Sequence, residues 1–430
     1  MSAAISDPWP APRVKEPLDA VVRLPGSKSL TNRALVLAAI AEGPSVVRRA
    51  LRSRDSLLMA RALTALGSTV DTSGDDWTVT PGEFVRDAEI DCGLAGTVMR
   101  FVPPLAALSA GTVSFDGDPH MRNRPVGPVL SALGDLGVPV TGTALPFSVV
   151  GTGQVRGGTV VLDASGSSQF VSALLLAGAR YERGIEIRHN GPSVPSLPHI
   201  DMTVSILREH GVEVEAPEPG APATRWRVVP GPIAAVDHTI EPDLSNAAPF
   251  LALAALSGGS VTVPGWPQHT DQPGDRLRDL LTEMGCTVQL HHDGLTLTGP
   301  TPGTLRGLDA DLHDVGELTP AVAALCALAS TPSRLTGVGH IRAHETDRLS
   351  ALAAELGGLG ADVTEHPDGL ELRPASLHGG LFHTYADHRM AHAGVIVGAA
   401  VDGVEVENVA TTSKTFPDFA PFWADLTRTA

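Results

Sequence analysis

The sequence predicts an α/β protein built from six copies of one unit of about 72 residues. Two patterns with nearly constant spacing support this prediction. In the first, an Ala/Leu-rich helix precedes a small turn and a short alternating strand, with turns at positions 43, 111, 184, 259, 332 and 403. In the second, Leu-x-x-Leu-Gly-x-x-Val places glycines at positions 67, 137, 211, 285 and 360. Each unit therefore carries two helices and several short strands.

The two patterns define the elements of each repeat. The first predicts six helix–turn–strand segments whose helices include Arg33, Phe101, Phe170, Ala247, Leu318 and Arg389. The second is typical of an amphipathic helix that ends at a glycine C′ cap before a strand. Its sixth copy is missing, and the C-terminal segment 416–427 is expected to stand in its place.

The composition excludes several classes of protein. Of the 430 residues, 43% are hydrophobic and only 18% are charged, which excludes a disordered or collagen-like chain. Aromatic residues make up 4% and the formal net charge is −17, so a large nucleic-acid surface is not expected. An anionic ligand must therefore bind in a local basic pocket of an acidic protein.

Nothing in the sequence indicates export or a membrane partner. The first 24 residues are polar and proline-rich, and no apolar run approaches the roughly 18 residues of a membrane span. The three cysteines lie far apart and include no CxxC pair. We expect a cytoplasmic monomer that binds neither nucleic acid nor membranes.

Polar residues gather just ahead of the first helix of every repeat. The clusters span residues 25–33, 93–100, 165–169, 242–246, 315–319 and 385–389. Each Ser, Thr, Asp or Asn there is a good N-cap when taken alone. Taken together, helix N-termini offer free N–H groups and partial positive charge. If these ends face one site, they can bind phosphates or carboxylates in an acidic protein.

Several standard motifs are absent. Gly26-Ser-Lys-Ser29 lacks the earlier glycine of a phosphate-binding P-loop, because Val21 stands at that position. No GxGxxG motif follows a predicted strand. His291 and His292 are typical of a hairpin turn, and there is no HExxH zinc motif.

Seven short motifs follow one another along the chain. They are Pro25-Gly-Ser-Lys-Ser-x-x-Asn-Arg33, Ala95-Gly-Thr-x-Met-Arg100, Arg122-x-Arg124-Pro125, Ser167-Ser-Gln169, Glu345-Thr-Asp-Arg348, Asp387-His-Arg-Met390 and Lys414-Thr-Phe-Pro417. Any one of them is weak, but all seven in this order are specific. In them the chain resembles the 5-enolpyruvylshikimate-3-phosphate synthase family over nearly its whole length.

The resemblance implies a two-domain enolpyruvyl transferase fold, an inside-out α/β barrel with six βαβαββ-type repeats, three per domain. One domain would span 25–240, and the other would join 1–24 to 241–430 through two hinge crossings. The implied reaction transfers the enolpyruvyl group of phosphoenolpyruvate to the 5-hydroxyl of shikimate 3-phosphate and releases phosphate. The family proceeds by addition and elimination, without a metal or organic cofactor.

The resemblance also implies residue roles. The expected contacts of shikimate 3-phosphate are Lys28, Ser29, Arg33, Ser167, Ser168, Gln169, Ser196, Glu317, His340 and His344. Those of phosphoenolpyruvate are Lys28, Gly96, Arg124, Gln169, Arg348, Arg389 and Lys414. Glu317 fills the position that takes the 5-hydroxyl proton. Lys28 and Glu345 are both candidates for protonating the methylene carbon, and the choice between them stays open.

The sequence departs from the family at a few positions. His340 and His344 stand where many members carry asparagine and lysine, so substrate contacts there would depend on pH. Leu94 and Phe101 likewise replace a common asparagine and proline.

Two alternatives remain. UDP-N-acetylglucosamine enolpyruvyltransferases share this fold and chemistry, but they typically carry Lys-Asn where Lys28-Ser29 stands, and often a cysteine in the loop that spans 116–124 here. The other alternative is a non-catalytic protein that only binds anionic metabolites, against which the intact lysine, acid and arginine set argues.

Overall fold

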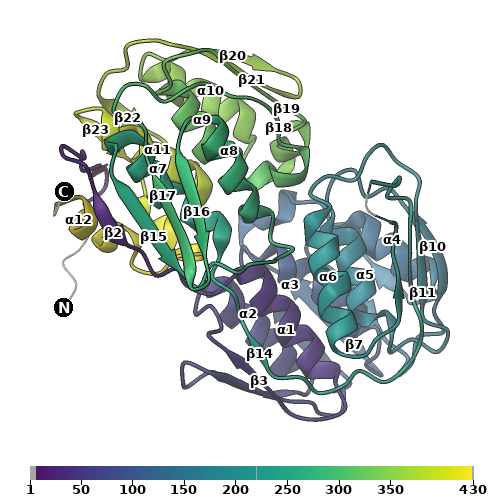
Figure 1. Ribbon diagram of the computed structural model, residues 1–430. Helices are drawn as coiled ribbons and strands as arrows, with labels where there is room; N and C mark the ends of the chain where they lie inside the picture. Colours follow the sequence, from purple (N-terminus) through teal and green to yellow (C-terminus); the bar gives the residue numbers. More distant parts are fainter. Residues whose placement is uncertain (1–5, 219, 429–430) are drawn as a thin grey trace. The chain divides into compact units, whose positions relative to one another are not determined.

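The computed structural model describes residues 6–218 and 220–428. The chain divides into two compact units, which are coloured along the sequence in Figure 1. The central unit is Gly26–Ile240, and the flanking unit joins Met1–Pro25 to Glu241–Ala430. The described residues form six small sheets, and no helix among them is long and apolar enough to cross a membrane. The predicted α/β fold of repeated βα units is confirmed.

The second repeat of the central unit shows the complete pattern. Its elements are β6 (Ala88–Asp91), α3 (Gly96–Ala106), β7 (Thr112–Asp116), α4 (Gly127–Asp135), β8 (Val140–Thr141) and β9 (Phe147–Val150). The sheet order is β6-β7-β9-β8, with β6 and β7 parallel and β9 antiparallel to both its neighbours. The third repeat has the same order in β10 (Gly158–Leu162), α5 (Gln169–Gly178), β11 (Ile185–His189), α6 (Pro198–Glu209), β12 (Val214–Glu215) and β13 (Arg225–Val228).

The first repeat of the central unit is closed by the end of that unit. Its elements are α1 (Lys28–Ile40), β3 (Ser45–Arg48), α2 (Arg54–Ala65), β4 (Thr69–Asp71) and β5 (Trp77–Thr80). The missing first strand is β14 (His238–Thr239), which pairs in parallel with β3 through the register His238 opposite Val47. The last strand of the central unit therefore completes its first sheet, next to the crossing into the flanking unit.

The flanking unit repeats this design. Its first repeat consists of β2 (Asp19–Val21), α7 (Ala248–Ser257), β15 (Ser260–Pro264), α8 (Leu277–Glu283), β16 (Thr287–His291) and β17 (Gly294–Thr298). Its second repeat consists of β18 (Asp309–Asp311), α9 (Thr319–Ala327), β19 (Ser333–Thr336), α10 (Arg348–Gly358), β20 (Asp362–His366) and β21 (Gly369–Arg373). The N-terminal strand β2 pairs in parallel with β15, so it plays the part that β14 plays in the central unit.

The last repeat is incomplete. It contains β22 (Gly380–Phe382), α11 (His388–Ala400), β23 (Val404–Val406) and α12 (Phe419–Arg428). In place of a second hairpin, β1 (Trp9–Pro10) pairs antiparallel with β23. Helix α12 occupies the segment that was expected to stand in for the missing sixth pattern.

The five glycines of the second sequence pattern are helix C′ caps. All have positive φ, from 75° at Gly211 to 117° at Gly67. After each glycine, the next backbone N–H donates to the carbonyl of the first leucine of the pattern, as Ser68 does to Leu63 at 3.1 Å and Ala361 to Leu356 at 3.0 Å. This is the Schellman geometry, which needs a residue that adopts the left-handed region without strain.

The first helix of each repeat is buried within its unit. Every residue of α3 is buried, and α3 packs against α5. In the flanking unit α11 packs against α7 and α9. The strands alternate instead, as in β5, where Trp77 and Val79 are buried and their neighbours are exposed. Helices therefore form the centre of each unit and sheets its outside, as Figure 1 shows.

Candidate active site

In the central unit, the N-termini of α1, α3 and α5 lie together. The Asn32 amide of α1 donates to the Thr97 hydroxyl of α3 at 2.7 Å. The Arg100 guanidinium of α3 donates to the Gln169 side-chain oxygen at the start of α5 at 2.8 Å. Three of the predicted polar clusters are thus brought together, and the positive ends of three helices share one region.

Lys28 is the first residue of α1. The Ser27 hydroxyl caps this helix by accepting from the Leu30 backbone N–H at 3.4 Å. The Lys28 ammonium lies 3.6 Å from the carboxylate of Asp55, which is buried at the start of α2. The lysine side chain is 19% exposed, so its charge is accessible to a ligand while a buried carboxylate holds it in place.

Arg100 links α5 to the loop that carries Arg124. Its Nε and Nη2 atoms both donate to the Pro125 carbonyl, at 3.0 and 2.8 Å. The guanidinium also lies 5.4 Å from the centre of the Phe170 ring. A Cβ atom on Gly96 would lie 3.2 Å from Nη1 of Arg124, so the Arg124 guanidinium packs against the start of α3. Glycine at this position leaves the helix N-terminus open to a ligand.

Three predicted serines lie at the starts of α5 and α6. Ser168 is the N-cap of α5 and is 4% exposed, and the Ser167 hydroxyl accepts from the Gln169 N–H at 3.2 Å. Ser196, just before α6, has a φ of 53° and its carbonyl accepts from the His199 N–H at 3.1 Å. Their hydroxyls are suited to bind a phosphate at the helix ends.

Arg33 is an interior residue of the central unit, 1% exposed. Its guanidinium donates to the Ser29 carbonyl at 3.0 Å, the Thr203 hydroxyl at 2.7 Å and the His199 carbonyl at 2.8 Å. Burial lowers the pKa of Arg33 to about 9. These bonds tie Ser29 of α1 to α6, and a direct contact between Arg33 and a substrate stays a prediction.

In the flanking unit, cations and carboxylates alternate in one connected chain. The Lys414 ammonium donates to Glu345 at 2.7 Å, and Arg348 Nη2 donates to the other oxygen of Glu345 at 3.1 Å. Arg348 Nε donates to Asp387 at 2.7 Å, and Asp387 also accepts from the Arg389 backbone N–H at 2.8 Å. The structure therefore brings together Glu345, Arg348, Arg389 and Lys414, which the sequence placed in three separate motifs.

The two arginines of this chain are buried. Burial alone would lower the pKa of Arg348, but the Asp387 and Glu345 carboxylates outweigh burial and raise it. Burial lowers the pKa of Arg389, whose Nη1 donates to the Ser245 carbonyl at 3.0 Å. A buried cation without a full set of anionic partners favours an anionic ligand.

Glu317 of the flanking unit lies next to these residues. It lies in the 3₁₀ helix His313–Leu318 that leads into α9. The Ser245 hydroxyl donates to Glu317 Oε1 at 3.4 Å, and the carbonyl of Ser245 is the one that accepts from Arg389. Glu317, the expected base, and Arg389, an expected contact of phosphoenolpyruvate, therefore share Ser245 as a neighbour.

His340 and His344 lie next to Glu317 and Arg348 of the flanking unit. Arg348 Nη1 lies 3.0 Å from His344 Nδ1, and because arginine only donates, Nδ1 must accept and the proton is on Nε2. Burial lowers the pKa of His340 to about 4. A Cβ atom on Gly316 would lie 2.5 Å from His340 Nε2, so this ring packs against the backbone next to Glu317.

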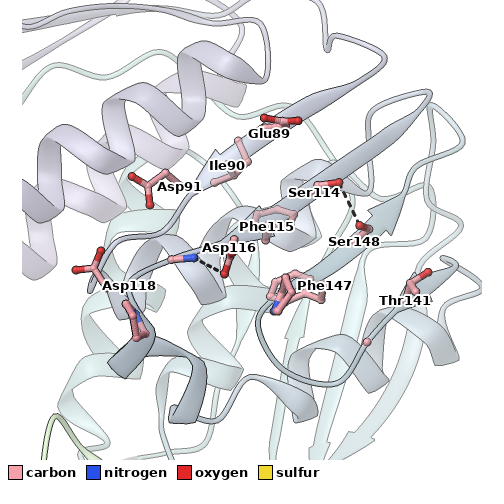
Figure 2. A pocket seen from close by; sticks show the side chains of 14 residues that line it. Glu89, Ile90, Asp91, Ser114, Phe115, Asp116, Asp118, Thr141, Phe147 and Ser148 are labelled. Carbon is pink, nitrogen blue, oxygen red and sulfur yellow. Dashed lines mark hydrogen bonds between the residues drawn. The ribbon is translucent and has the colours of Figure 1, made fainter.

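A separate hollow lies on the outer face of the sheet that contains β6 and β7. Its volume is about 820 Å³, and its lining includes the carboxylates of Glu89, Asp91, Asp116 and Asp118, all labelled in Figure 2. Arg122 pairs with Asp116 and Arg54 pairs with Asp118, so the lining has no surplus of cations and the hollow is unsuited to the anionic substrates expected. Within 6–218 and 220–428, no group of three or more His, Cys, Asp or Glu side chains could hold a metal ion.

The structure divides the predicted site residues between the two units. The central unit holds Lys28, Ser29, Arg33, Gly96, Arg124, Ser167, Ser168, Gln169 and Ser196, and the flanking unit holds Glu317, His340, His344, Glu345, Arg348, Arg389 and Lys414. The sequence did not predict roles for Asp55, Arg100 or Asp387. Arg100 and Asp387 stood inside the motifs and could have been found there, whereas nothing in the sequence distinguished Asp55.

The fold is the one found in enolpyruvyl transferases. The EPSP synthase of Acinetobacter baumannii superposes with a TM-score of 0.80 over 97% of each chain at 22% identity. The enolpyruvyl transferase NikO of Streptomyces tendae superposes with a TM-score of 0.75 over 96% of each chain at 20% identity. These two likenesses show the fold.

Sequence comparison identifies the family within this class. Residues 12–423 match the model of the family described as EPSP synthase (3-phosphoshikimate 1-carboxyvinyltransferase). A protein of Kocuria rhizophila named 3-phosphoshikimate 1-carboxyvinyltransferase is 55% identical over 99% of this chain and 98% of its own length. The chain belongs to the EPSP synthase family.

Proposed function

We propose that the site residues of both units bind phosphoenolpyruvate and shikimate 3-phosphate. The chain is a transferase of the EPSP synthase family, and its reaction transfers the enolpyruvyl group from phosphoenolpyruvate to shikimate 3-phosphate in the shikimate pathway. The grouping of Lys414, Arg348 and Arg389 around the carboxylates of Glu345 and Asp387 supports the residue assignment most strongly, because it brings three cations together in a protein of net charge −17. The assignment requires the predicted site residues of both units to bind the same two substrates.

Phosphoenolpyruvate carries a phosphate and a carboxylate. Arg348, Arg389 and Lys414 would bind them from the flanking unit, because arginine forks match both groups. Lys28, Gly96, Arg124 and Gln169 would bind from the central unit. Glu345, which accepts from both Lys414 and Arg348, is a candidate acid alongside Lys28.

Shikimate 3-phosphate would be bound mainly by the central unit. Ser29, Ser167, Ser168 and Ser196 would contact its phosphate at the starts of α1, α5 and α6, with Lys28 beside them, and Arg33 and Gln169 would contact the ring. Glu317, His340 and His344 would reach the ring hydroxyls from the flanking unit.

The chemistry follows from these positions. The oxygen of the 5-hydroxyl attacks C2 of phosphoenolpyruvate while Glu317 takes the hydroxyl proton. Lys28 or Glu345 protonates the methylene carbon. The resulting tetrahedral intermediate loses a proton from its new methyl group and releases phosphate, which restores the double bond. The fixed cations stabilise the charge that develops on the departing phosphate.

Substrate-specific kinetics would test the assignment. Lys414→Ala should raise KM for phosphoenolpyruvate by about tenfold or more and change KM for shikimate 3-phosphate little, whereas Ser168→Ala should do the reverse. Lys28→Met should impair both. Equal changes in both KM values for Lys414→Ala and Ser168→Ala would contradict the division. A monomeric state and a cytoplasmic location remain predictions of the sequence.

A further inference from the structure

We propose that Glu355 and Tyr385 form a positioning pair for the arginines that bind phosphoenolpyruvate. Their hydrogen bond holds the turn before α11 in a strained conformation, and that turn places Asp387 against Arg348. The inference rests on the proposed function only where it assigns Arg348 and Arg389 to phosphoenolpyruvate.

The turn that leads into α11 is strained at two consecutive residues. Tyr385 has a φ of 55° and Ala386 a φ of 56°, both in the left-handed region. Residues with a Cβ atom rarely adopt this region, and glycine, which has no such penalty, occupies neither position. The surrounding contacts must therefore hold the turn in place.

Glu355 supplies two of these contacts. Its Oε1 accepts from the Tyr385 hydroxyl at 2.7 Å, and its Oε2 accepts from the His383 backbone N–H at 2.8 Å. Glu355 is only 7% exposed, so its carboxylate needs both donors. On the other side of the turn, the Thr411 hydroxyl donates to the Ala386 carbonyl at 3.0 Å.

Helix α10 carries two residues that contact this segment, Arg348 and Glu355. Arg348 is its first residue, and Glu355 follows seven positions later. With 3.6 residues per turn, seven positions are close to two full turns, so both side chains leave the same face of the helix. One end of that face binds Asp387 through Arg348 at 2.7 Å, and the other end binds Tyr385 through Glu355. A change in the turn must therefore alter both connections.

Asp387 also sets the position of the second arginine, Arg389. It is the N-cap of α11 and accepts from the Arg389 backbone N–H, so the start of α11 follows wherever Asp387 lies. The two arginines consequently depend on one turn for their spacing. The hydrogen bond to Glu355 raises the pKa of Tyr385 to about 12, so the phenol stays a donor near neutral pH.

The Tyr385→Phe variant removes one hydroxyl and keeps the ring. We expect its KM for phosphoenolpyruvate to rise by about three- to tenfold, with a change of less than about twofold in KM for shikimate 3-phosphate. Combining it with Glu355→Gln should be no worse than Glu355→Gln alone, because both changes break the same link. Adding Ala386→Gly to Tyr385→Phe should recover part of the loss, because glycine adopts the left-handed turn without strain.

The chain offers a matched control, since it contains only two tyrosines. The other, Tyr181, is buried in the central unit and its hydroxyl donates to the Pro104 carbonyl at 3.0 Å. Tyr181→Phe should lower the thermal midpoint without changing KM for phosphoenolpyruvate. If Tyr181→Phe raised KM for phosphoenolpyruvate as much as Tyr385→Phe does, the loss would be general and the inference would be overturned. The same conclusion would follow if Tyr385→Phe raised KM equally for both substrates.

A further variant separates the inference from the assignment on which it rests. Arg348→Lys should raise KM for phosphoenolpyruvate strongly if Arg348 binds that substrate. An unchanged KM in Arg348→Lys would remove the assignment itself. A raised KM in Arg348→Lys together with a wild-type KM in Tyr385→Phe would leave the assignment standing and overturn only the positioning pair.

Discussion

The Asp387→Asn substitution removes one negative charge from the interior of the flanking unit. Asp387 has no exposed surface and accepts from Arg348 Nε at 2.7 Å, from Arg348 Nη2 at 3.1 Å and from the Arg389 backbone N–H at 2.8 Å. Asparagine has nearly the same shape, but one of the two acceptor oxygens is replaced by an amide nitrogen, which cannot accept from arginine. The substitution therefore breaks at least one bond between Arg348 and Asp387 and leaves Glu345 as the remaining carboxylate bound to Arg348.

The expected loss follows from these contacts. Hydrogen bonds to charged groups stabilise by about 1.5–3 kcal/mol each, and separating a buried ion pair costs about 3–5 kcal/mol. Because Glu345 still binds Arg348, we expect the free energy of unfolding to fall by about 2–4 kcal/mol. A displaced Arg348 should also raise KM for phosphoenolpyruvate by about 10- to 100-fold, since about 1.4 kcal/mol corresponds to a factor of ten.

Phosphate release at varied phosphoenolpyruvate and saturating shikimate 3-phosphate would measure KM, and urea unfolding would measure stability. Glu186→Gln is the control, because Glu186 also binds two arginines, Arg188 at 2.6 Å and Arg225 at 2.8 Å, but on the solvent side of β11. Exposed ion pairs contribute little, so this control should change neither quantity much. A wild-type KM for phosphoenolpyruvate in Asp387→Asn would refute the role given to the buried ion pair.

Three further predictions concern other parts of the site. Glu317→Gln should lower kcat by about 10²- to 10⁴-fold and change the substrate KM values little, and equal losses in both would make its role one of binding. Arg100→Lys should raise both KM values several-fold, because lysine cannot hold the Pro125 carbonyl and Gln169 at once, and unchanged kinetics would count against this link. His340 has a pKa of about 4 in the folded chain against an ordinary 6.5, so the stability it contributes is present above pH 6.5 and is lost as pH falls toward 4. His340→Asn should therefore flatten the decline of unfolding free energy between pH 7 and 5, and an unchanged slope would contradict the burial argument.

The repeats were predictable because their signals are local. The glycines at 67, 137, 211, 285 and 360 cap helices, and the residue after each glycine bonds to a leucine five positions earlier, so six residues of sequence contain the whole motif. The closure of the first repeat by β14 was not visible in the pattern. Its two residues pair with Val47 and Arg48, far away in the chain, and a strand of two residues has no periodicity to detect.

The same distinction applies to the site. Residues that bear cations at helix N-termini could be predicted, because their chemistry and position are local. The roles of three other residues depend on partners far away in the sequence. Asp387 binds Arg348, 39 residues away, Arg100 binds Gln169, 69 residues away, and Glu355 binds Tyr385, 30 residues away. Taken alone, Asp387 is typical of an N-cap, and the structure shows that it serves both as the cap and as the partner of Arg348.

Phosphate release by the purified chain would test the central claim most directly. Incubation with phosphoenolpyruvate and shikimate 3-phosphate together should release inorganic phosphate, and either substrate alone should release none. Phosphate release with UDP-N-acetylglucosamine in place of shikimate 3-phosphate would contradict the account, as would binding of both substrates without turnover.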